Sequence, residues 1–330
     1  MLVSHSSRGV RSERSATVTD LGLAPDIVWI DLLQPNADEI ILVERATGLK
    51  VPTLEELSEI ETSSRLRAAD GALYLSAPMV YNADSDDPHA TPVGFVLTRD
   101  RLITVRFAEL RPFSALEQDI RSNGMPLTST GLFSDLLGAV VDRLADVLER
   151  IAGELDALSH RLFRAGPTVP LRRRGAAAES ADLRIILRRV GRSGDLASKI
   201  RDSLLGIGRI VPFVLSLAAD WLPADVKPRL ETVRQDVASL NDYDAHLVNK
   251  LQLLLDATLG MINIEQNNII KVLTIVSVVG VPPTLVASMY GMNFRHMPEL
   301  DWAWGYPYGL AVIALSAVLP LLWFKWRGWL

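Results

Sequence analysis

Two runs of 23 residues, Val272–Phe294 and Trp302–Phe324, contain no Asp, Glu, Lys or Arg. The hydrocarbon core of a bilayer is about 30 Å thick and is crossed by roughly 20 helical residues, so either run is long enough to span it. Buried helices of soluble proteins rarely extend this far without a charge. The sequence therefore predicts two C-terminal transmembrane helices, at 272–294 and 302–324, joined by an external loop at 295–301.

The charges beside the two runs predict their orientation. Lys250 and Lys271 precede the first run, and Lys325 and Arg327 follow the second. Lys and Arg are enriched on the cytoplasmic flanks of membrane spans. We therefore expect a multi-pass protein of the cell membrane whose N-terminus and C-terminal tail, 325–330, are both cytoplasmic. The start of the chain lacks the apolar segment of a secretory signal peptide, so we expect no cleavage there.

The region before the first run is rich in charge. All but five of the chain's 34 basic and 39 acidic residues lie in 1–271, which predicts a water-soluble region. The chain has no cysteine, which excludes disulfides, thiolate metal sites and cysteine nucleophiles. Its net charge of -5 and its lack of interleaved basic and aromatic residues argue against a nucleic-acid partner.

The soluble region combines strand and helix patterns. Residues 1–25 are rich in Ser, Arg and Thr, and we expect a mobile N-terminal tail. A mixed α/β and helical cytoplasmic domain is predicted at 26–222. Thr53 and Glu56 have the spacing of a capping box, which predicts a helix start. Short apolar runs predict strands at 26–32, 72–81, 92–99 and 101–107, and helical periodicity appears at 36–48 and 53–61.

Long helical segments follow, at roughly 132–164 and 180–205, and then a stalk helix at 223–271. Apolar residues on this last segment recur every three or four positions, and no proline separates Pro228 from Pro282. We expect one helix of about 60 residues that runs into the first span, on the order of 90 Å long. The recurring residues are Leu230, Val233, Val237, Leu240, Tyr243, Leu247, Leu251 and Leu254.

Two short motifs follow one another at the end of the first run. Tyr290-Gly291-Met292-Asn293 closes the run, and Met297-Pro298-Glu299-Leu300 lies in the loop. Together they resemble the signature of the CorA family of divalent-cation channels. The resemblance is close over 271–307 and looser over 29–32 and 93–107. It implies a funnel-shaped homopentamer in the bilayer, with an α/β cytoplasmic domain, a long helical stalk and two C-terminal transmembrane helices, of which the first lines the pore.

The resemblance also implies roles for particular residues. Gly291, Met292 and Asn293 would form the selectivity filter, where Asn293 amide oxygens bind a hydrated Mg²⁺ ion without stripping its water. Tyr290 and the loop residues Met297, Pro298, Glu299 and Leu300 would support it. Asp256 would add a ring of carboxylates able to bind metal. The implied pore-lining residues are Asp256, Asn267, Leu273, Val281, Thr284 and Ser288.

The residues alone leave other interpretations open. Gly291 and Asn293 could form an ordinary helix C-cap, and the hydroxyls of Thr284 and Ser288 could bond their own backbone or a neighbouring helix. The sequence also departs from the family pattern. Arg295 stands where relatives often have an acid, Ser288 replaces a small glycine and Val281 replaces a bulkier residue. A weaker capture of cations and a looser apolar gate would follow.

Two charged clusters lie outside these motifs. Asp84, Asp86 and Asp87 lack the glycine and the glutamate that an EF-hand requires, so they predict either a solvated hairpin or a regulatory divalent-cation sensor. Arg172–Arg174 and the arginines of the next helix predict a solvated helix face or an ion network between subunits. The five histidines have no metal-ligand spacing, and no nucleophile or nucleotide-binding motif is present.

These patterns predict a CorA-type channel rather than an enzyme. It would admit Mg²⁺, and also Co²⁺ or Ni²⁺, down the membrane potential and would be gated by intracellular divalent cation. Mg²⁺ would be both the transported ion and a regulatory ligand, with no other cofactor. Two alternatives remain: a ZntB-like transporter that couples zinc to protons, and a membrane-tethered scaffold or sensor without transport. The order of ion preference and any proton coupling stay open.

Overall fold

The structure is a computed structural model that describes residues 1–6, 27–59, 61, 65–85, 87–123, 127–164, 176–292, 297–298 and 301–329. The chain divides into two compact units. The first contains Met1–Gly166 and Arg188–Leu254, and the second contains Pro167–Leu187 and Leu255–Leu330.

A six-stranded sheet forms the centre of the first unit, in the order β1-β2-β6-β5-β4-β3. β2 and β6 pair in parallel, and every other neighbouring pair is antiparallel. Asp70 and Gly71 have positive φ angles of 51° and 73° and form the tight turn between β3 and β4, as an Asp-Gly pair favours. The strands are β1 (Leu2–Ser6), β2 (Ile27–Leu33), β3 (Leu66–Ala69), β4 (Ala72–Tyr81), β5 (His89–Leu97) and β6 (Leu102–Arg106).

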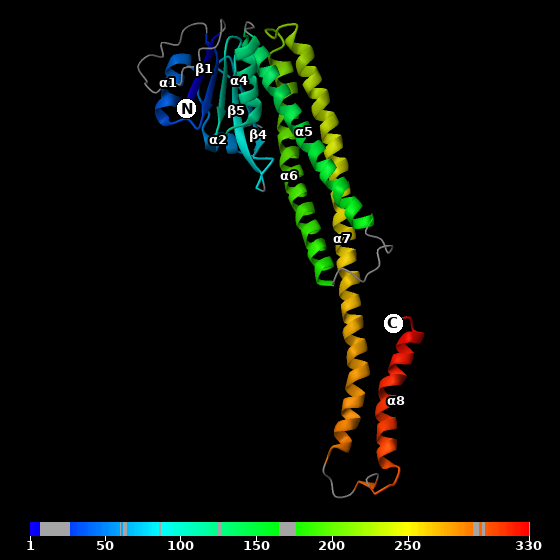
Figure 1. The fold of residues 1–330 in the computed structure, drawn as a ribbon. Helices are drawn as coiled ribbons and strands as arrows, with labels where there is room; N and C mark the ends of the chain where they lie inside the picture. The colour runs from blue at the N-terminus through cyan, green and yellow to red at the C-terminus, as the bar shows by residue number, and fades with distance from the viewer. Residues whose placement is uncertain are drawn as a thin grey trace. The chain divides into compact units, whose positions relative to one another are not determined.

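Helices cover both faces of this sheet (Figure 1). α1 (Ala37–Thr47) and α2 (Leu54–Ser58) bury Val43 and Leu57 against one face. Both helices begin with a capping box, so the helix start predicted from Thr53 and Glu56 is confirmed. The other face carries a buried polar chain. Trp29 Nε1 donates to Thr104 Oγ1, which donates to Asp31, and Asp31 pairs with Arg106 at 2.8 Å.

The expectation of a mobile tail is wrong for Leu2–Ser6, because this segment forms the edge strand β1. All five residues are buried, and β1 pairs with β2 in antiparallel register. His5 stacks on Trp29 with ring centroids 4.5 Å apart. Burial lowers the pKa of His5 to about 4, so the ring is neutral at pH 7. Residues 7–26 lie outside the described part of the chain.

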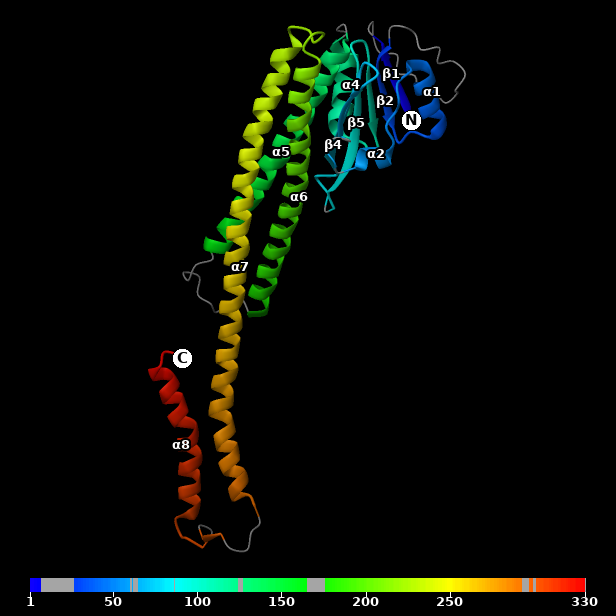
Figure 2. The same ribbon diagram turned by 180° about the vertical axis from the view of Figure 1, so that it is seen from behind.

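Three long helices lie beside the sheet in the first unit: α5 (Ser129–Arg164), the later part of α6 (Ala176–Leu217) and the first part of α7 (Val226–Tyr290) (Figures 1 and 2). α4 (Arg111–Asn123), which the sequence did not predict, precedes them. α6 continues past the predicted end at residue 205, and Pro212 lies inside it. The end was misplaced because packing, rather than local propensity, sustains a helix of this length.

The buried stripe of α7 differs from the predicted one at two positions, because Leu240 is only partly buried and Tyr243 is exposed. Leu230, Val237 and Leu251 are buried as expected. Tyr243 is 38% exposed, however, and Asp244 is wholly buried in its place. A seven-residue spacing joins 230, 237, 244 and 251, so the acid occupies a core position of the repeat.

In the second unit, the later part of α7 and α8 (Gly305–Trp326) run side by side in opposite directions (Figures 1 and 2). The predicted continuity of stalk and first span is confirmed, because α7 is a single helix of 65 residues. It passes through Pro282 and Pro283 and ends at Tyr290, four residues before the charge-free run ends at Phe294.

Candidate functional site

One face of α7 carries all six of the residues expected to line a pore. At 100° per residue they fall within an arc of about 120° around the helix axis. Each of them is exposed in the single chain, and Leu273 and Val281 are 65% and 62% exposed. The six are Asp256, Asn267, Leu273, Val281, Thr284 and Ser288. The structure thus brings them onto one stripe, with the polar side chains at its ends and an apolar section between them.

A shallow groove of about 550 Å³ lies along this stripe. Val281, Thr284 and Ser288 line it, together with Ser277 and Gly280, which the sequence analysis did not single out. Gly280 and Ser277 precede Thr284 by four and seven residues, and this helical spacing could have identified them. The groove therefore combines small and hydroxylated side chains within an otherwise apolar helix.

The hydroxyl of Thr284 is already used within the helix. Its Oγ1 donates to the carbonyl oxygen of Gly280 at 2.8 Å. This is the bond to the helix's own backbone that the sequence analysis kept as an alternative. The oxygen lone pairs of Thr284 remain available to a cation or to water in the groove. Proline lacks an N–H, so Pro282 and Pro283 also leave the carbonyls of Val278 and Val279 without their usual helical donors. Oxygen acceptors are therefore concentrated in this part of the span.

The signature motif begins where α7 ends. The N–H of Gly291 donates to the carbonyls of Ala287 and Ser288, at 3.0 and 3.2 Å. Gly291 does not have a positive φ angle, so the backbone conformation does not itself require glycine at this position. Met292, the second residue of the expected filter, is 47% exposed in the single chain. Asn293, the central residue of the expected filter, lies outside the described residues.

The loop between α7 and α8 is described only in part. Met297 is half-buried and Pro298 is exposed. Arg295, Glu299 and Leu300 lie outside the described residues, so their expected roles stay predictions.

Tyr290, the last residue of α7, lies beside the first part of α8. Gly309 of α8 is buried, and a Cβ atom placed on it would lie 3.9 Å from the ring of Tyr290. The small residue therefore allows the aromatic ring to pack directly against the backbone of the second span. Sequence analysis placed Tyr290 in the signature but did not predict this partner, since a glycine within an apolar run gives no distinctive signal.

Three arginines pair with Asp84, which lies in the β4–β5 hairpin. Its carboxylate pairs with Arg111 at 2.7 Å, with Arg143 at 2.8 Å and with Arg150. Burial raises the pKa of Asp84, but the hydrogen bond from Arg143 and the charges of the three arginines outweigh it, and the pKa is lowered. A carboxylate held in this way is a poor cation sensor. Asp86 lies outside the described residues, and Asp87 pairs with His89 at 2.9 Å.

A second unpredicted feature lies in the stalk. Nε and Nη2 of Arg201, on α6, both contact Oδ2 of Asp244 at 2.8 Å. The other oxygen, Oδ1, is buried and has no hydrogen-bond partner among the described residues. Burial raises the pKa of Asp244, and the charge and hydrogen bonds of Arg201 offset this only in part. The stalk therefore contains a carboxylate that is only half satisfied.

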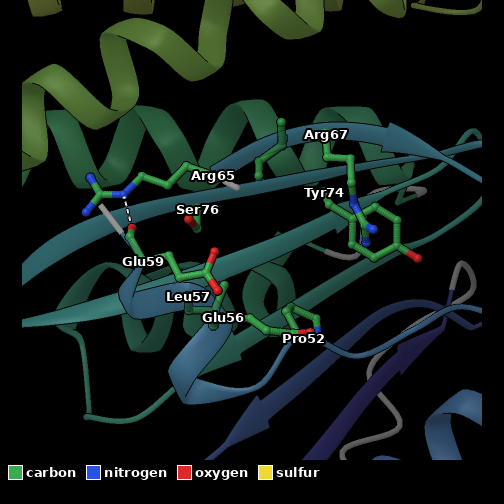
Figure 3. Close-up of a pocket in the computed structure, with 9 residues that line it drawn as sticks. Pro52, Glu56, Leu57, Glu59, Arg65, Arg67, Tyr74 and Ser76 are labelled. Atoms are coloured by element: carbon green, nitrogen blue, oxygen red, sulfur yellow. Dashed lines mark hydrogen bonds between the residues drawn. The ribbon is translucent and has the colours of Figure 1, made fainter. Parts of the chain in front are cut away.

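A pocket of about 250 Å³ lies between α2 and the β3 edge of the sheet (Figure 3). The guanidinium of Arg67 lies over the ring of Tyr74, 4.6 Å from its centroid, and Arg65 donates to the carbonyl of Glu59. Ser76 Oγ has no hydrogen-bond partner in the part of the chain that the structure describes. The described residues contain no group of three or more Asp, Glu, His or Cys side chains able to hold a metal.

The arginines expected to form a basic stretch fall into two parts. Arg172–Arg174 lie outside the described residues. Arg184, Arg188 and Arg189 are exposed on α6, as a solvated helix face requires.

The greater part of each charge-free run lies in a helix long and apolar enough to cross a membrane. In the described residues, the most apolar window of α7 has none of its residues buried, and only 11% of that of α8 is buried. A family model described as the CorA-like Mg2+ transporter protein matches residues 25–326. The chain belongs to this family.

Individual CorA-family relatives agree with this assignment. The Magnesium transport protein CorA of Salmonella typhimurium is 34% identical over 306 residues, which is 92% of either chain. The protein of the same name from Escherichia coli K12 is 34% identical over 304 residues and covers the same shares. The solved structure of the CorA magnesium transporter from Methanocaldococcus jannaschii shares the fold with a TM-score of 0.73, at 18% identity and with 99% of each chain covered.

Proposed function

We propose that this chain transports Mg²⁺ into the cell as a subunit of a channel of the CorA type. The observation that carries the proposal is the exposed stripe of α7, which presents Thr284 and Ser288 in a segment without any charge. Hydroxyl and carbonyl oxygens suit a hard cation such as Mg²⁺. Relatives along 92% of the chain carry the name magnesium transport protein, which supports the same cargo.

The conduit requires several copies of the chain. Two helices cannot surround water while every backbone group stays satisfied in lipid, so the α7 stripes of neighbouring copies would face a common axis. We propose the homopentamer that the family resemblance implies. The 65% exposed Leu273 and the 62% exposed Val281 would then form apolar rings, which close a pore by excluding water.

Selectivity would arise at the outer end of α7. There we propose that five copies of Asn293 present amide oxygens to a hydrated Mg²⁺ ion, because Mg²⁺ releases its water reluctantly. Asp256 would supply a carboxylate ring at the inner end of the same stripe. Cytoplasmic Mg²⁺ would act as a regulatory ligand, at positions formed between copies of the chain.

The driving force would be the membrane potential. Each elementary charge gains about 2.3 kcal/mol per 100 mV, so a divalent cation gains roughly 4.6 kcal/mol. We propose that both termini are cytoplasmic, which the basic flanks at Lys271 and Lys325 support.

The test is ion flux into proteoliposomes made from the full chain, under an applied potential, with and without a proton gradient. Wild-type protein should admit Mg²⁺ at the same rate with and without a proton gradient across the membrane. Asn293→Ala should abolish the flux or its preference for Mg²⁺. Asn268→Ala, at an exposed asparagine of α7 that lies outside the charge-free run and off the stripe, is the matched control and should behave as wild type.

Other results would favour other functions. Flux of Zn²⁺ alone, and only with a proton gradient, would replace the proposal with proton-coupled zinc transport. An absence of any divalent flux from correctly inserted protein would leave a tethered scaffold or sensor. Equal flux in wild type and Asn293→Ala would refute the role of the filter.

A further inference from the structure

Basic and aromatic side chains converge at one end of the α7–α8 pair. We call them the basic–aromatic cluster: Lys271 of α7, and Trp323, Lys325, Arg327 and Trp329 at the end of α8. Lys271 directly precedes the first charge-free run, and Lys325 directly follows the second. The cations of both helices therefore lie at the same boundary between apolar and polar sequence.

The end of α8 is folded back to build this cluster. Gly328 has a φ angle of 69°, and its N–H donates to the carbonyl of Lys325 at 3.2 Å. The N–H of Trp329 then donates to the carbonyl of Phe324 at 2.9 Å, which completes a Schellman-type cap. As a result the ring of Trp329 stacks on buried Phe324, with centroids 5.4 Å apart.

Two cations lie over rings at the end of α8, one from α7 and one from the residue that caps α8. Lys271 Nζ lies 5.6 Å from the centroid of Trp329, and the guanidinium of Arg327 lies 5.5 Å from that of Trp323. These contacts hold the cations in position and leave their N–H groups free to donate elsewhere. Trp329 remains 41% exposed, so the cluster is open on one side.

The parts of α7 and α8 that build the cluster carry few acids. Over 255–292 and 301–329 the acids are Asp256, Glu265 and Asp301. Glu265 comes nearest to the cluster in sequence, six residues before Lys271. Lys271, Lys325 and Arg327 thus lie at the same end of the two helices, and the ion pairs of the described residues involve none of them.

We propose that the basic–aromatic cluster binds the headgroup phosphate of an anionic phospholipid. Lys271, Lys325 and Arg327 would donate to the phosphate oxygens, and the exposed rings of Trp323 and Trp326 would lie at the level of the headgroups. Basic pockets between membrane helices recognise such headgroups by charge. Because Lys271 belongs to the helix that carries the pore stripe, an occupied site would tie α7 to α8 at this boundary.

The apolar surroundings favour a lipid over a free phosphate. The cluster adjoins two segments of 23 residues that lack any charge, where acyl chains would continue from the bound headgroup. The assignment to the cytoplasmic leaflet rests on the proposed function and its orientation. The binding itself does not, because it is measured without transport.

The test counts lipids bound to the full chain in neutral detergent by native mass spectrometry. Phosphatidylglycerol and phosphatidylcholine with the same acyl chains are titrated separately. Wild type should prefer phosphatidylglycerol. Each of K271Q, K325Q and R327Q should weaken that preference about fivefold, the effect of one basic residue near a charged membrane surface. K227Q, at an exposed lysine of α7 outside the cluster, should change nothing.

Three results would overturn the proposal. The first is equal binding of both lipids by wild type, and the second is a preference for phosphatidylglycerol that persists in the triple variant K271Q/K325Q/R327Q. The third is binding of glycerol phosphate as tight as that of the intact lipid. The single variants are measured beside the triple variant, so a folding defect in one protein does not decide the outcome. Lost ion flux with retained lipid preference would refute the transport function alone, and the reverse would refute the lipid site alone.

Discussion

The pairing of Arg201 with Asp244 allows a sharp test of how the stalk is stabilised. Asp244 is wholly buried, and both contacts from Arg201 fall on Oδ2. Arg201→Met would leave a buried carboxylate without any partner. Breaking a buried ion pair in this way costs about 3–5 kcal/mol. Since the Arg201 side chain is 42% exposed, water already weakens the pair, and we expect about 2 kcal/mol.

Removing the acid should have the opposite consequence. Asp244→Leu fits an apolar side chain into the seven-residue repeat, and replacing buried ionic groups by apolar ones is often neutral or stabilising. The double variant Arg201→Met with Asp244→Leu should therefore match Asp244→Leu to within about 0.5 kcal/mol. Most of the loss in Arg201→Met would thus come from the stranded charge.

The measurement is the thermal midpoint of the full chain in detergent, read by tryptophan fluorescence. A loss of 2 kcal/mol corresponds to about 4–8 °C for a unit of this size. Arg209→Met is the control, because Arg209 is an exposed residue of the same helix. A fall in midpoint of that size for Asp244→Leu, or no recovery in the double variant, would refute the reasoning.

The pH dependence adds a second check. Burial raises the pKa of Asp244 in the folded state, so the folded protein binds a proton more readily than the unfolded chain. Stability from this group is therefore greatest at low pH and is lost as the pH rises through the raised pKa. Arg201→Met removes the opposing cation, so its deficit should shrink as the pH falls toward about 3.9, the ordinary value for Asp.

Two other substitutions test contacts described above. Gly309→Leu should cost about 1–3 kcal/mol of stability by overpacking against Tyr290. Gly309→Ala should be tolerated, because its Cβ would lie 3.9 Å from the ring of Tyr290. Equal thermal midpoints for the two variants would argue against this packing. Asp84→Asn should cost about 1 kcal/mol at neutral pH, since the carboxylate is 38% exposed yet balances three arginines. Its lowered pKa means that this stability is present above about pH 3.9 and is lost as the pH falls through the lowered value, so the deficit should vanish there in a pH series of midpoints.

The sequence predicted those elements that composition and local spacing determine. The two spans follow from runs without charge, the continuity of α7 from its periodic apolar residues, and the start of α2 from the Thr53 and Glu56 spacing. The pore stripe was predicted through a family motif. Its residues do fall on one face, because their spacing along a single helix fixes their direction.

The features that were missed depend on distant parts of the chain. β1 forms a strand only because it pairs with β2. Its short sequence alone gives no strong indication of a strand. The buried position of Asp244 depends on Arg201, 43 residues earlier. Gly309 matters only because Tyr290 packs on it. Contacts of this kind arise from tertiary packing, which overrides local propensity.

The parallel pairing of β2 with β6 has a consequence for synthesis of the chain. The sheet cannot close until Arg106, the last residue of β6, has left the ribosome. The first charge-free run begins at Val272, 166 residues later (272 - 106), which takes about 8–33 s at 5–20 residues per second. We therefore expect the sheet to be complete before the membrane-insertion machinery receives its first hydrophobic segment.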